Sequence, residues 1–325
     1  MTMQGKHTLS ALLTIVGIIA NNANAALFDR GNGLIFDDTL NVSWIKDANV
    51  FSTLANQANA SGPGGYGRFI DQIISANNGK IYDTRSYLNP SGIYNLHGYD
   101  FGSSSGELTW WGAAAFIGYL NNVNYLGFDD WRLPDVKPIN GTVFTYSSAF
   151  RLTTNGSDDQ GLNITSTQSE LAYNFNVNLN NPNYRLPDGS QNPNWTGIAN
   201  PEFEDLTNNV LDSFINLQSY GYWSGLDTNY IPGGAWYLST YSGAQDISLK
   251  TSYYSVWAVR SGDSIIIPEP NTITLLFIGV FGFIFHRKRL CCIKARLFKS
   301  QVAELQIRAA LRRIQLGMPI TVAMP

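Results

Sequence analysis

The chain has 325 residues and a formal net charge of −3, with 44% hydrophobic and 13% aromatic residues. The charge is unevenly divided: residues 26–270 hold 11 basic and 23 acidic residues, a net −12, whereas residues 271–325 hold 9 basic residues and one acid. Because phosphate binding requires a basic surface, the acidic part of the chain is a poor candidate for nucleic-acid recognition.

Residues 1–25 have the three parts of a secretory signal peptide. A basic start at residues 6–7 precedes an apolar run over residues 9–20, and residues 23–25 read Ala-Asn-Ala, a small-x-small cleavage pattern. We therefore expect cleavage between Ala25 and Ala26, with a short signal anchor as the alternative.

Residues 26–267 would then be the exported part, which is long enough to bury a sizeable core as one domain. Both cysteines, Cys291 and Cys292, lie beyond it, so no disulfide can staple this domain. Its stability must come from packing, to which aromatic side chains contribute most per residue.

The first half of the exported part predicts two strands, a loop and a helix. Residues 27–37 read as strand, turn and strand around a Gly-Asn-Gly turn. Residues 52–106 are rich in Ser, Asn, Gly and Tyr, with Gly-Pro-Gly-Gly at 62–65, and predict a long surface loop. Residues 108–120 predict the clearest helix, with alanines and large apolar residues on one side.

The second half predicts a loop, a helix and a set of strands. A second loop-rich region covers residues 155–200. Residues 202–217 have apolar residues at helical spacing. Residues 220–260 alternate aromatic and small residues around Gly-containing turns, which predicts antiparallel strands. The whole predicts an α+β domain with antiparallel strands, one or two helices and long loops.

Several short strings follow one another in a recognisable order. They are Leu-Phe-Asp-Arg-Gly at 27–31, Trp-Ile-Lys-Asp-Ala-Asn at 44–49, Asp130-Trp131-Arg132-Leu133-Pro134, Ser169-Glu170-Leu171, Tyr222-Trp223-Ser224-Gly225, Ala235-Trp236, and Val256-Trp257-Ala258-Val259-Arg260. Over roughly residues 27–263, this order resembles the Lcl C-terminal-like domain family, with poor matching at 52–106 and 175–200. The resemblance implies a fold related to C-type lectins and to formylglycine-generating enzymes. It also implies a surface role, since a member of the family is implicated in binding sulfated polysaccharide.

The motif residues have a structural interpretation. A tryptophan buries a large apolar surface, and truncating a buried one costs about 3–5 kcal/mol. Pro134 would end a strand, because proline cannot donate to a ladder. Arg132 and Arg260 are expected to hold carboxylates through bidentate forks, with Glu170 the preferred partner of one of them. The alternative is that some of the tryptophans are exposed and stack on sugar rings.

Catalytic patterns are weak in this sequence. Residues 102–106 read Gly-Ser-Ser-Ser-Gly, but a nucleophile elbow needs a preceding strand, a following helix and a later histidine. His97 comes before it and is the exported part's single histidine, so it cannot build a His-based metal site. We interpret 102–106 as a Ser-rich loop and His97 as a loop or packing residue.

Paired carboxylates occur at 37–38, 129–130, 158–159 and 202–205. A glycosidase needs two carboxyl groups facing each other across a cleft, but an acidic chain brings acids together by chance. Asp158 and Asp159 could ligate calcium, although EF-hand spacing is absent. We expect no catalytic residue, cofactor or metal.

Near the C-terminal end, Pro268-Glu269-Pro270 precedes an apolar run over 271–285 and the basic cluster His-Arg287-Lys288-Arg289. Residues 268–289 resemble the PEP-CTERM sorting signal that exosortase reads in Gram-negative bacteria. Fifteen helical residues reach only about 22 Å, short of a bilayer core of roughly 30 Å, so the basic residues would have to snorkel. The positive-inside rule places the C-terminus in the cytoplasm. A buried core helix is the alternative.

Residues 290–325 depart from that family's pattern, which normally stops soon after the basic cluster. Residues 297–316 could form a basic amphipathic helix on the inner leaflet, or the extension could be an accidental continuation of the reading frame. The triplet Glu-Pro-Asn at 269–271 matches a sugar-selecting motif of calcium-dependent lectins, but it lies in the sorting segment. Formylglycine-generating activity would need cysteines that the exported part lacks.

These observations predict a non-catalytic exported protein at the cell surface or in the extracellular matrix, with a glycan-binding or adhesion domain. Its partners would be an exosortase-type processing enzyme, extracellular polysaccharide, and the membrane through residues 271–285 before processing. A polysaccharide-acting hydrolase and a purely structural matrix protein are the alternatives. The net −12 favours neutral glycans or proteins over sulfated polymers unless a local basic patch exists.

Overall fold

The computed structural model describes residues 27–85, 89–146, 152–205, 210–228, 230–263, and 301–312 without 302 and 310; only the backbone of Val210 is described. The chain forms two compact units, residues 1–264 and 265–325. The predicted signal peptide, sorting signal and membrane segment all lie outside the described residues. Among the residues that are described, no helix has the length and apolar character needed to cross a membrane. The described part of 301–312 is helical, within the segment for which a helix was one interpretation.

The first sheet of the described chain has six strands, in the order β13-β3-β2-β1-β7-β8. Their bounds are β1 Leu27–Gly31, β2 Leu34–Asp37, β3 Val42–Ile45, β7 Glu202–Asp205, β8 Val210–Ser213 and β13 Val259–Ser261. β1 runs parallel to β7, and the other neighbours are antiparallel. The predicted hairpin over residues 27–37 is confirmed. Its turn residues 31–33 have positive φ, which Gly and Asn tolerate best.

A second sheet of five strands has the order β11-β10-β9-β12-β6 within the described residues. Its strands are β6 Glu107–Leu108, β9 Tyr222–Thr228, β10 Gly234–Ser239, β11 Ala244–Leu249 and β12 Tyr254–Ser255. β9 runs parallel to β12, and the remaining neighbours are antiparallel. The strands and turns predicted for residues 220–260 are therefore confirmed.

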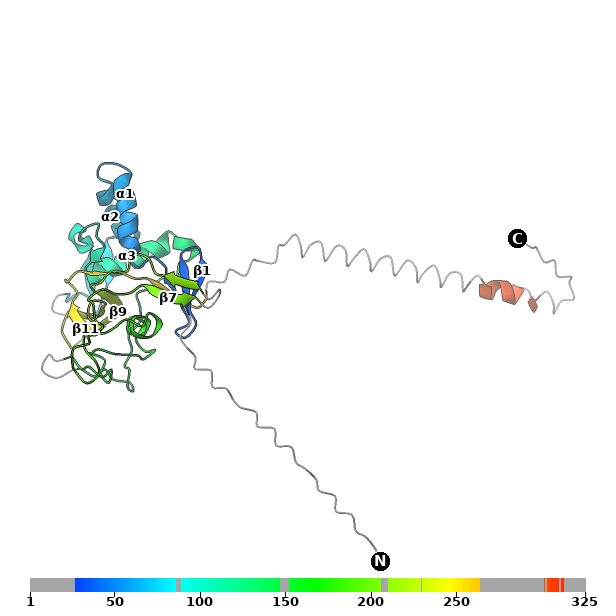
Figure 1. The fold of residues 1–325 in the computed structure, drawn as a ribbon. Coiled ribbons are helices and arrows are strands. Elements are labelled where there is room, and N and C mark those ends of the chain that lie inside the picture. Colours follow the sequence, from blue (N-terminus) through cyan, green and yellow to red (C-terminus); the bar gives the residue numbers. More distant parts are fainter. Residues whose placement is uncertain are drawn as a thin grey trace, which may run out of the picture. The chain divides into compact units, whose positions relative to one another are not determined.

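Residues 52–106 are not a long loop, and that prediction is wrong. They contain most of α1 (Val50–Ala60), then α2 (Gly65–Ala76), β4 (Lys80–Tyr82), β5 (Ile93–Asn95) and the 3-10 turn η1 (Gly98–Phe101). Figure 1 shows α1 and α2 lying side by side. The polar composition concealed the helical spacing of the few apolar residues, among which Phe69, Ile70 and Ile73 are buried on one face of α2.

The helix expected over residues 108–120 is present as α3 (Trp110–Asn122). Thr109 caps it, because its side chain accepts a hydrogen bond from the amide of Gly112 at 3.1 Å. The expectation that its apolar residues share one side is wrong, since eight residues of α3 are buried and they surround most of the helix. α3 lies between α2 and the second sheet, so both flanks are covered.

The helix predicted over residues 202–217 is also wrong. This segment is the hairpin β7–β8, with Phe203 paired to Asp212. Burial along β7 alternates, with Phe203 buried between exposed Glu202 and Glu204, as in a half-buried strand. Because β7 adds to β1, where Asp29 and Asp205 stand 176 positions apart, a distant partner decides the conformation of β7.

The second loop-rich region, residues 155–200, is largely irregular as predicted. It contains one short helical passage, α4 (Glu170–Tyr173), which continues into a π-helical turn, η4 (Asn174–Asn178). A further turn, η2 (Tyr125–Gly127), follows α3. The fold class is thus α+β, as expected, although the described residues hold three longer helices instead of one or two.

The core has two large clusters, and the second sheet contributes to both. Trp223 belongs to the cluster beneath α1, α2 and α3, whereas its neighbour Tyr222 belongs to the cluster on the six-stranded sheet. Successive residues of a strand point to opposite faces, so β9 joins the two layers. In the second cluster the rings of Trp44 and Trp257 are 4.8 Å apart.

Candidate functional site

The motif residues Trp131, Trp223, Trp236 and Trp257 are buried, with exposed fractions of 0–2%. Three of them donate their indole N–H to backbone carbonyls at 2.8–3.0 Å. Trp236 packs against Phe144 at 5.1 Å. None of the four rings can stack on a sugar, so the alternative in which they form an exposed platform is wrong.

The bidentate pairing predicted for Arg132 is present. Its two terminal nitrogens each lie 2.7 Å from a different carboxylate oxygen of Glu170. Glu170 also accepts the amide N–H of Asp135 at 2.7 Å. The adjoining Leu133 and Pro134 lie against β9, where the amide of Gly225 donates to the carbonyl of Pro134 at 2.9 Å.

Two more motif residues hold neighbouring segments together. Arg260 makes a second fork, with its Nε and Nη2 at 2.7 and 3.0 Å from the two carboxylate oxygens of Asp130. Its guanidinium also lies 4.0 Å from the centre of the Phe128 ring. The carbonyl of Ser224 accepts the indole N–H of Trp110 at 3.0 Å. These contacts join separate segments of the fold, as the structural interpretation of the motif expects.

The weak catalytic candidates do not come together. The Gly-Ser-Ser-Ser-Gly segment lies between η1 and β6, without the strand-to-helix turn of a nucleophile elbow. His97 contacts the hydroxyl of Tyr99 through Nδ1 at 3.0 Å and stacks on that ring at 4.7 Å. It is therefore a packing residue near the surface.

The proposed calcium pair is partly occupied by protein donors. Both carboxylate oxygens of Asp159 accept backbone amides, from Ile139 at 2.7 Å and from Thr145 at 2.6 Å. Within the part of the chain that the structure describes, no group of three or more His, Cys, Asp or Glu side chains is arranged to hold a metal ion.

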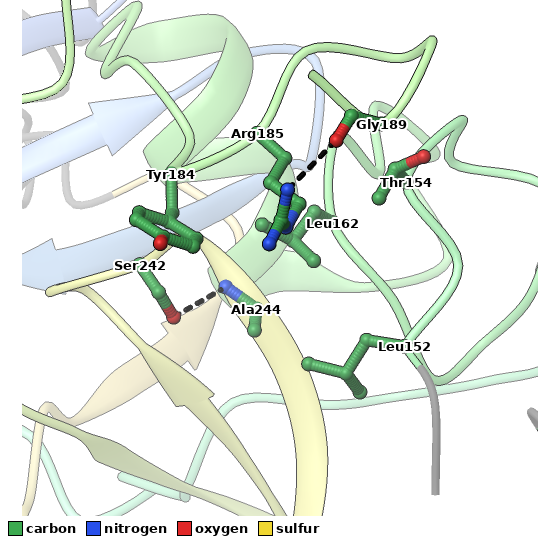
Figure 2. A pocket seen from close by; sticks show the side chains of 8 residues that line it. All are labelled: Leu152, Thr154, Leu162, Tyr184, Arg185, Gly189, Ser242 and Ala244. Atoms are coloured by element: carbon green, nitrogen blue, oxygen red, sulfur yellow. Dashed lines mark hydrogen bonds between the residues drawn. The ribbon is translucent and has the colours of Figure 1, made fainter. Parts of the chain in front are cut away.

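A cavity of about 540 Å³ lies where three loops meet the β10–β11 turn. Its lining residues are Leu152, Thr154, Leu162, Tyr184, Arg185, Gly189, Ser242 and Ala244. Figure 2 shows Tyr184 and Ser242 on one side, Thr154 on the other, and the guanidinium of Arg185 between them. These described lining residues include hydroxyls, an arginine and apolar carbons, but no carboxylate.

Backbone hydrogen bonds fix the walls of this cavity. The amide of Tyr184 donates to the carbonyl of Ser242 at 2.8 Å. The side chain of Asn163 donates to the carbonyls of Thr154 and Arg185, at 2.6 and 3.0 Å. The three loops are thus joined directly to one another and to the second sheet, and the cavity is preformed.

Arg185 is the charged residue of the cavity. One terminal nitrogen donates to the carbonyl of Gly189 at 2.8 Å, and its guanidinium carbon lies 5.2 Å from the centre of the Tyr184 ring. No described carboxylate lies within ion-pair distance of it, and the side chain is exposed. The remaining N–H groups of this guanidinium can therefore donate to a ligand.

An aromatic cluster borders the cavity on the side of Tyr184. Trp195 meets Tyr184 edge to face at 4.8 Å and Tyr241 at 5.1 Å. Its indole N–H donates to the carbonyl of Tyr241 at 2.6 Å, and the side chain of Tyr241 is half exposed. Sequence reasoning missed this cluster, because its members come from an irregular loop and a turn and show no periodicity.

A second hollow of about 390 Å³ lies beside the same loop. Its lining is rich in amides, with seven asparagines: Asn163, Asn176, Asn180, Asn181, Asn183, Asn192 and Asn194. Several of these side chains already bond the backbone, such as Asn176 to the carbonyl of Ile164 at 2.7 Å. This hollow is therefore mainly a product of loop architecture.

Comparison with known proteins finds no match to this chain among protein families, curated proteins or solved structures.

Proposed function

We propose that this chain is a non-catalytic exported protein whose domain binds glycans at the cell surface or in the extracellular matrix. The observation that carries the proposal is the cavity lined by Tyr184 and Arg185, with Trp195 and Tyr241 at its border. Preformed hollows of about 300–1,000 Å³ with a few convergent polar groups are typical ligand sites, and this one holds about 540 Å³.

The residue types suit a sugar. Aromatic rings present an apolar face to the C–H side of a pyranose, while their polar ends remain hydrated. Hydroxyls of Thr154 and Ser242 both donate and accept, and Arg185 donates in a planar fork. Together these side chains offer hydrogen bonds in several directions around the apolar side chains of Leu152 and Leu162.

A neutral glycan fits the charge better than a sulfated polymer. Residues 26–270 carry a net −12, which repels a polyanion at long range. Arg185 is a single cation and does not form a basic patch. Its guanidinium can donate hydrogen bonds to the hydroxyl groups of a neutral sugar. The described lining also lacks the two facing carboxylates that hydrolysis requires, which favours binding over the alternative of a polysaccharide-acting hydrolase.

The sequence motifs support the proposed location at the cell surface or in the extracellular matrix. The order of strings over roughly residues 27–263 resembles the Lcl C-terminal-like family, whose lectin-related fold would suit a surface module. The signal-peptide pattern and the segment 268–289 resemble those of proteins that exosortase processes in Gram-negative bacteria. After processing, the domain would remain at the surface or in extracellular polysaccharide.

The full-length protein should be screened against arrayed neutral and acidic glycans while the same samples are assayed for hydrolysis. Binding without turnover is the expected result. Turnover of any glycan would favour the hydrolase, and the absence of both would favour a purely structural matrix protein.

A further inference from the structure

A lysine and two aspartates meet below α3, away from the cavity. Lys250 follows β11, Asp227 belongs to β9, and Asp83 follows β4. The Nζ of Lys250 donates to Oδ1 of Asp83 and to Oδ2 of Asp227, the latter at 3.2 Å. The side chains of Lys250 and Asp83 are only 2% and 1% exposed, whereas that of Asp227 is 23% exposed.

The surroundings of this triad are apolar and aromatic. The Nζ of Lys250 lies 4.4 Å from the centre of the Trp110 ring. The other oxygen of Asp83, Oδ2, accepts the indole N–H of Trp111 at 2.8 Å and the side-chain amide Nδ2–H of Asn89 at 3.5 Å. Desolvating an ion pair so completely costs more than its attraction commonly returns, so a neutral product would be preferred here.

The geometry points to an intramolecular isopeptide bond between Lys250 and Asp83, formed with Asp227 as the proton carrier. Proton transfer within the pair turns the ammonium and carboxylate into an amine and a carboxylic acid, which an apolar site accommodates better. The lone pair of Nζ then attacks Cγ of Asp83. The C–N bond forms, the bond from Cγ to Oδ1 breaks, and one water leaves.

Each neighbour has a part in this step. The N–H groups of Trp111 and Asn89 hold Oδ2, where negative charge develops as Nζ attacks, in the manner of an oxyanion hole. Asp227 takes the proton that Nζ loses and passes it to the departing Oδ1. Because Asp227 is partly exposed, it lies on the side from which water can leave.

Such a bond would stabilise a domain that cannot form disulfides. The exported part contains no cysteine, so disulfides cannot restrict its unfolded state. The bond would join residues 167 positions apart and tie the segment after β4 to the end of β11. A cross-link that closes so long a loop removes much of the freedom of the unfolded chain.

A second lysine with two aspartate partners, more exposed to water, provides an internal control for this reaction. Lys46 also contacts two aspartates, Asp29 at 2.7 Å and Asp212 at 2.8 Å. The three side chains are 22–25% exposed, however, and no indole ring of the described residues lies over the Nζ of Lys46. Water stabilises these charges, so this triad should remain an ordinary ion pair.

Trypsin digestion of the denatured full-length protein, followed by mass spectrometry, tests the proposal directly. Tryptic cleavage places Asp83 in residues 81–85 and Lys250 at the end of residues 186–250. The expected product joins 81–85 to 186–260, uncut after Lys250, with the summed mass reduced by one water. Separate peptides 81–85, 186–250 and 251–260 would overturn the proposal, as would an equal cross-link at Lys46.

The variant Asp227→Asn tests the proton carrier. It should yield the separate peptides from a protein whose near-ultraviolet circular dichroism matches the wild type. A complete cross-link in this variant would overturn the assignment of Asp227, and the wild-type digest decides the bond itself even if the variant does not fold.

Discussion

Arg132 and Glu170 form a two-pronged ion pair that joins the segment after η2 to the first turn of α4, with both N···O distances at 2.7 Å. Glu170 also accepts the amide of Asp135, so one carboxylate satisfies three donors. The Glu170 side chain is largely buried, with an exposed fraction of 10%, whereas that of Arg132 is 29% exposed. This contact connects the motif to the long irregular region that carries the cavity.

Removing that carboxylate should destabilise the domain substantially. In Glu170→Ala, the guanidinium of Arg132 and the amide of Asp135 would lose their partner. We expect the free energy of unfolding to fall by about 3 kcal/mol, the lower end for a buried pair, because Arg132 keeps some water contact. Urea denaturation measures the change. The exposed Glu202→Ala is the control, and equal effects from both variants would contradict this role.

The packing of α1 against α2 depends on a glycine. A Cβ at Gly65 would lie 1.8 Å from the carbonyl oxygen of Ala58, so Gly65→Ala must push the two helices apart. We expect a lower Tm and a loss of more than about 2 kcal/mol of stability. Gly67→Ala is the matched control, since nothing lies within 4 Å of its Cβ. The control should be neutral or slightly stabilising, and equal losses would argue against this helix contact.

Glycan binding should depend on the arginine of the cavity. Arg185→Gln removes the planar guanidinium fork but keeps a polar side chain at this exposed position. We expect the affinity for the glycan to fall about tenfold or more. Arg68→Gln is matched in chemistry, because Arg68 is exposed and donates to a backbone carbonyl, that of Pro63, at 2.7 Å. Isothermal titration with a glycan identified by the array compares the two. Equal affinity for both variants would remove the cavity as the binding site.

A partly buried carboxyl in β11, that of Asp246, should make stability depend on pH. Burial raises the pKa of Asp246, against hydrogen bonds from Gln160 and Ile247 that lower it. The folded protein therefore holds this proton more tightly than the unfolded chain does. Stability contributed by the neutral acid is complete at low pH and is lost as pH rises from the unfolded value through the raised one.

Asp246→Asn should abolish that part of the pH dependence. An amide oxygen can still accept from Gln160 and Ile247, so the fold is retained. We expect the stability of the wild type, relative to the variant, to fall as pH rises above the ordinary aspartate range. Urea titrations at several pH values measure it. A difference that stays constant with pH would contradict the raised pKa.

The sorting proposal has its own test in an exosortase-bearing host. Glu269→Ala should leave the unprocessed protein in the inner membrane, because the enzyme would no longer recognise the Pro-Glu-Pro sequence. Glu304→Ala, which changes another acid near the C-terminal end, should be processed like the wild type. Fractionation and immunoblotting follow both forms. Normal release of the Glu269 variant would exclude this sorting mechanism.

Local patterns in the sequence predicted the elements that local interactions determine. The turn at residues 31–33 needs positive φ, and α3 has a Thr cap followed by helix-forming residues, so both could be recognised from neighbours alone. The motif predicted that Glu170 would pair with Arg132 or Arg260, and only the fold decided that the partner is Arg132. Composition misled where it outweighed spacing, as in α2, whose apolar face of Phe69, Ile70 and Ile73 lies in a segment rich in Gly, Ser and Asn.

Tertiary structure decided the rest, because the deciding partners are distant in the chain. β7 and β8 have apolar residues at helical spacing, yet pairing with β1 makes them strands. The cavity arises only when residues 152–162, 184–189 and 242–244 meet. Lys250 and Asp83 likewise stand 167 positions apart, and only folding removes both from water. The uneven charge, the absence of cysteine from residues 26–267, and the local turns and helix follow from the sequence alone. The cavity and the buried triad exist because long-range packing sets which side chains share a dry environment.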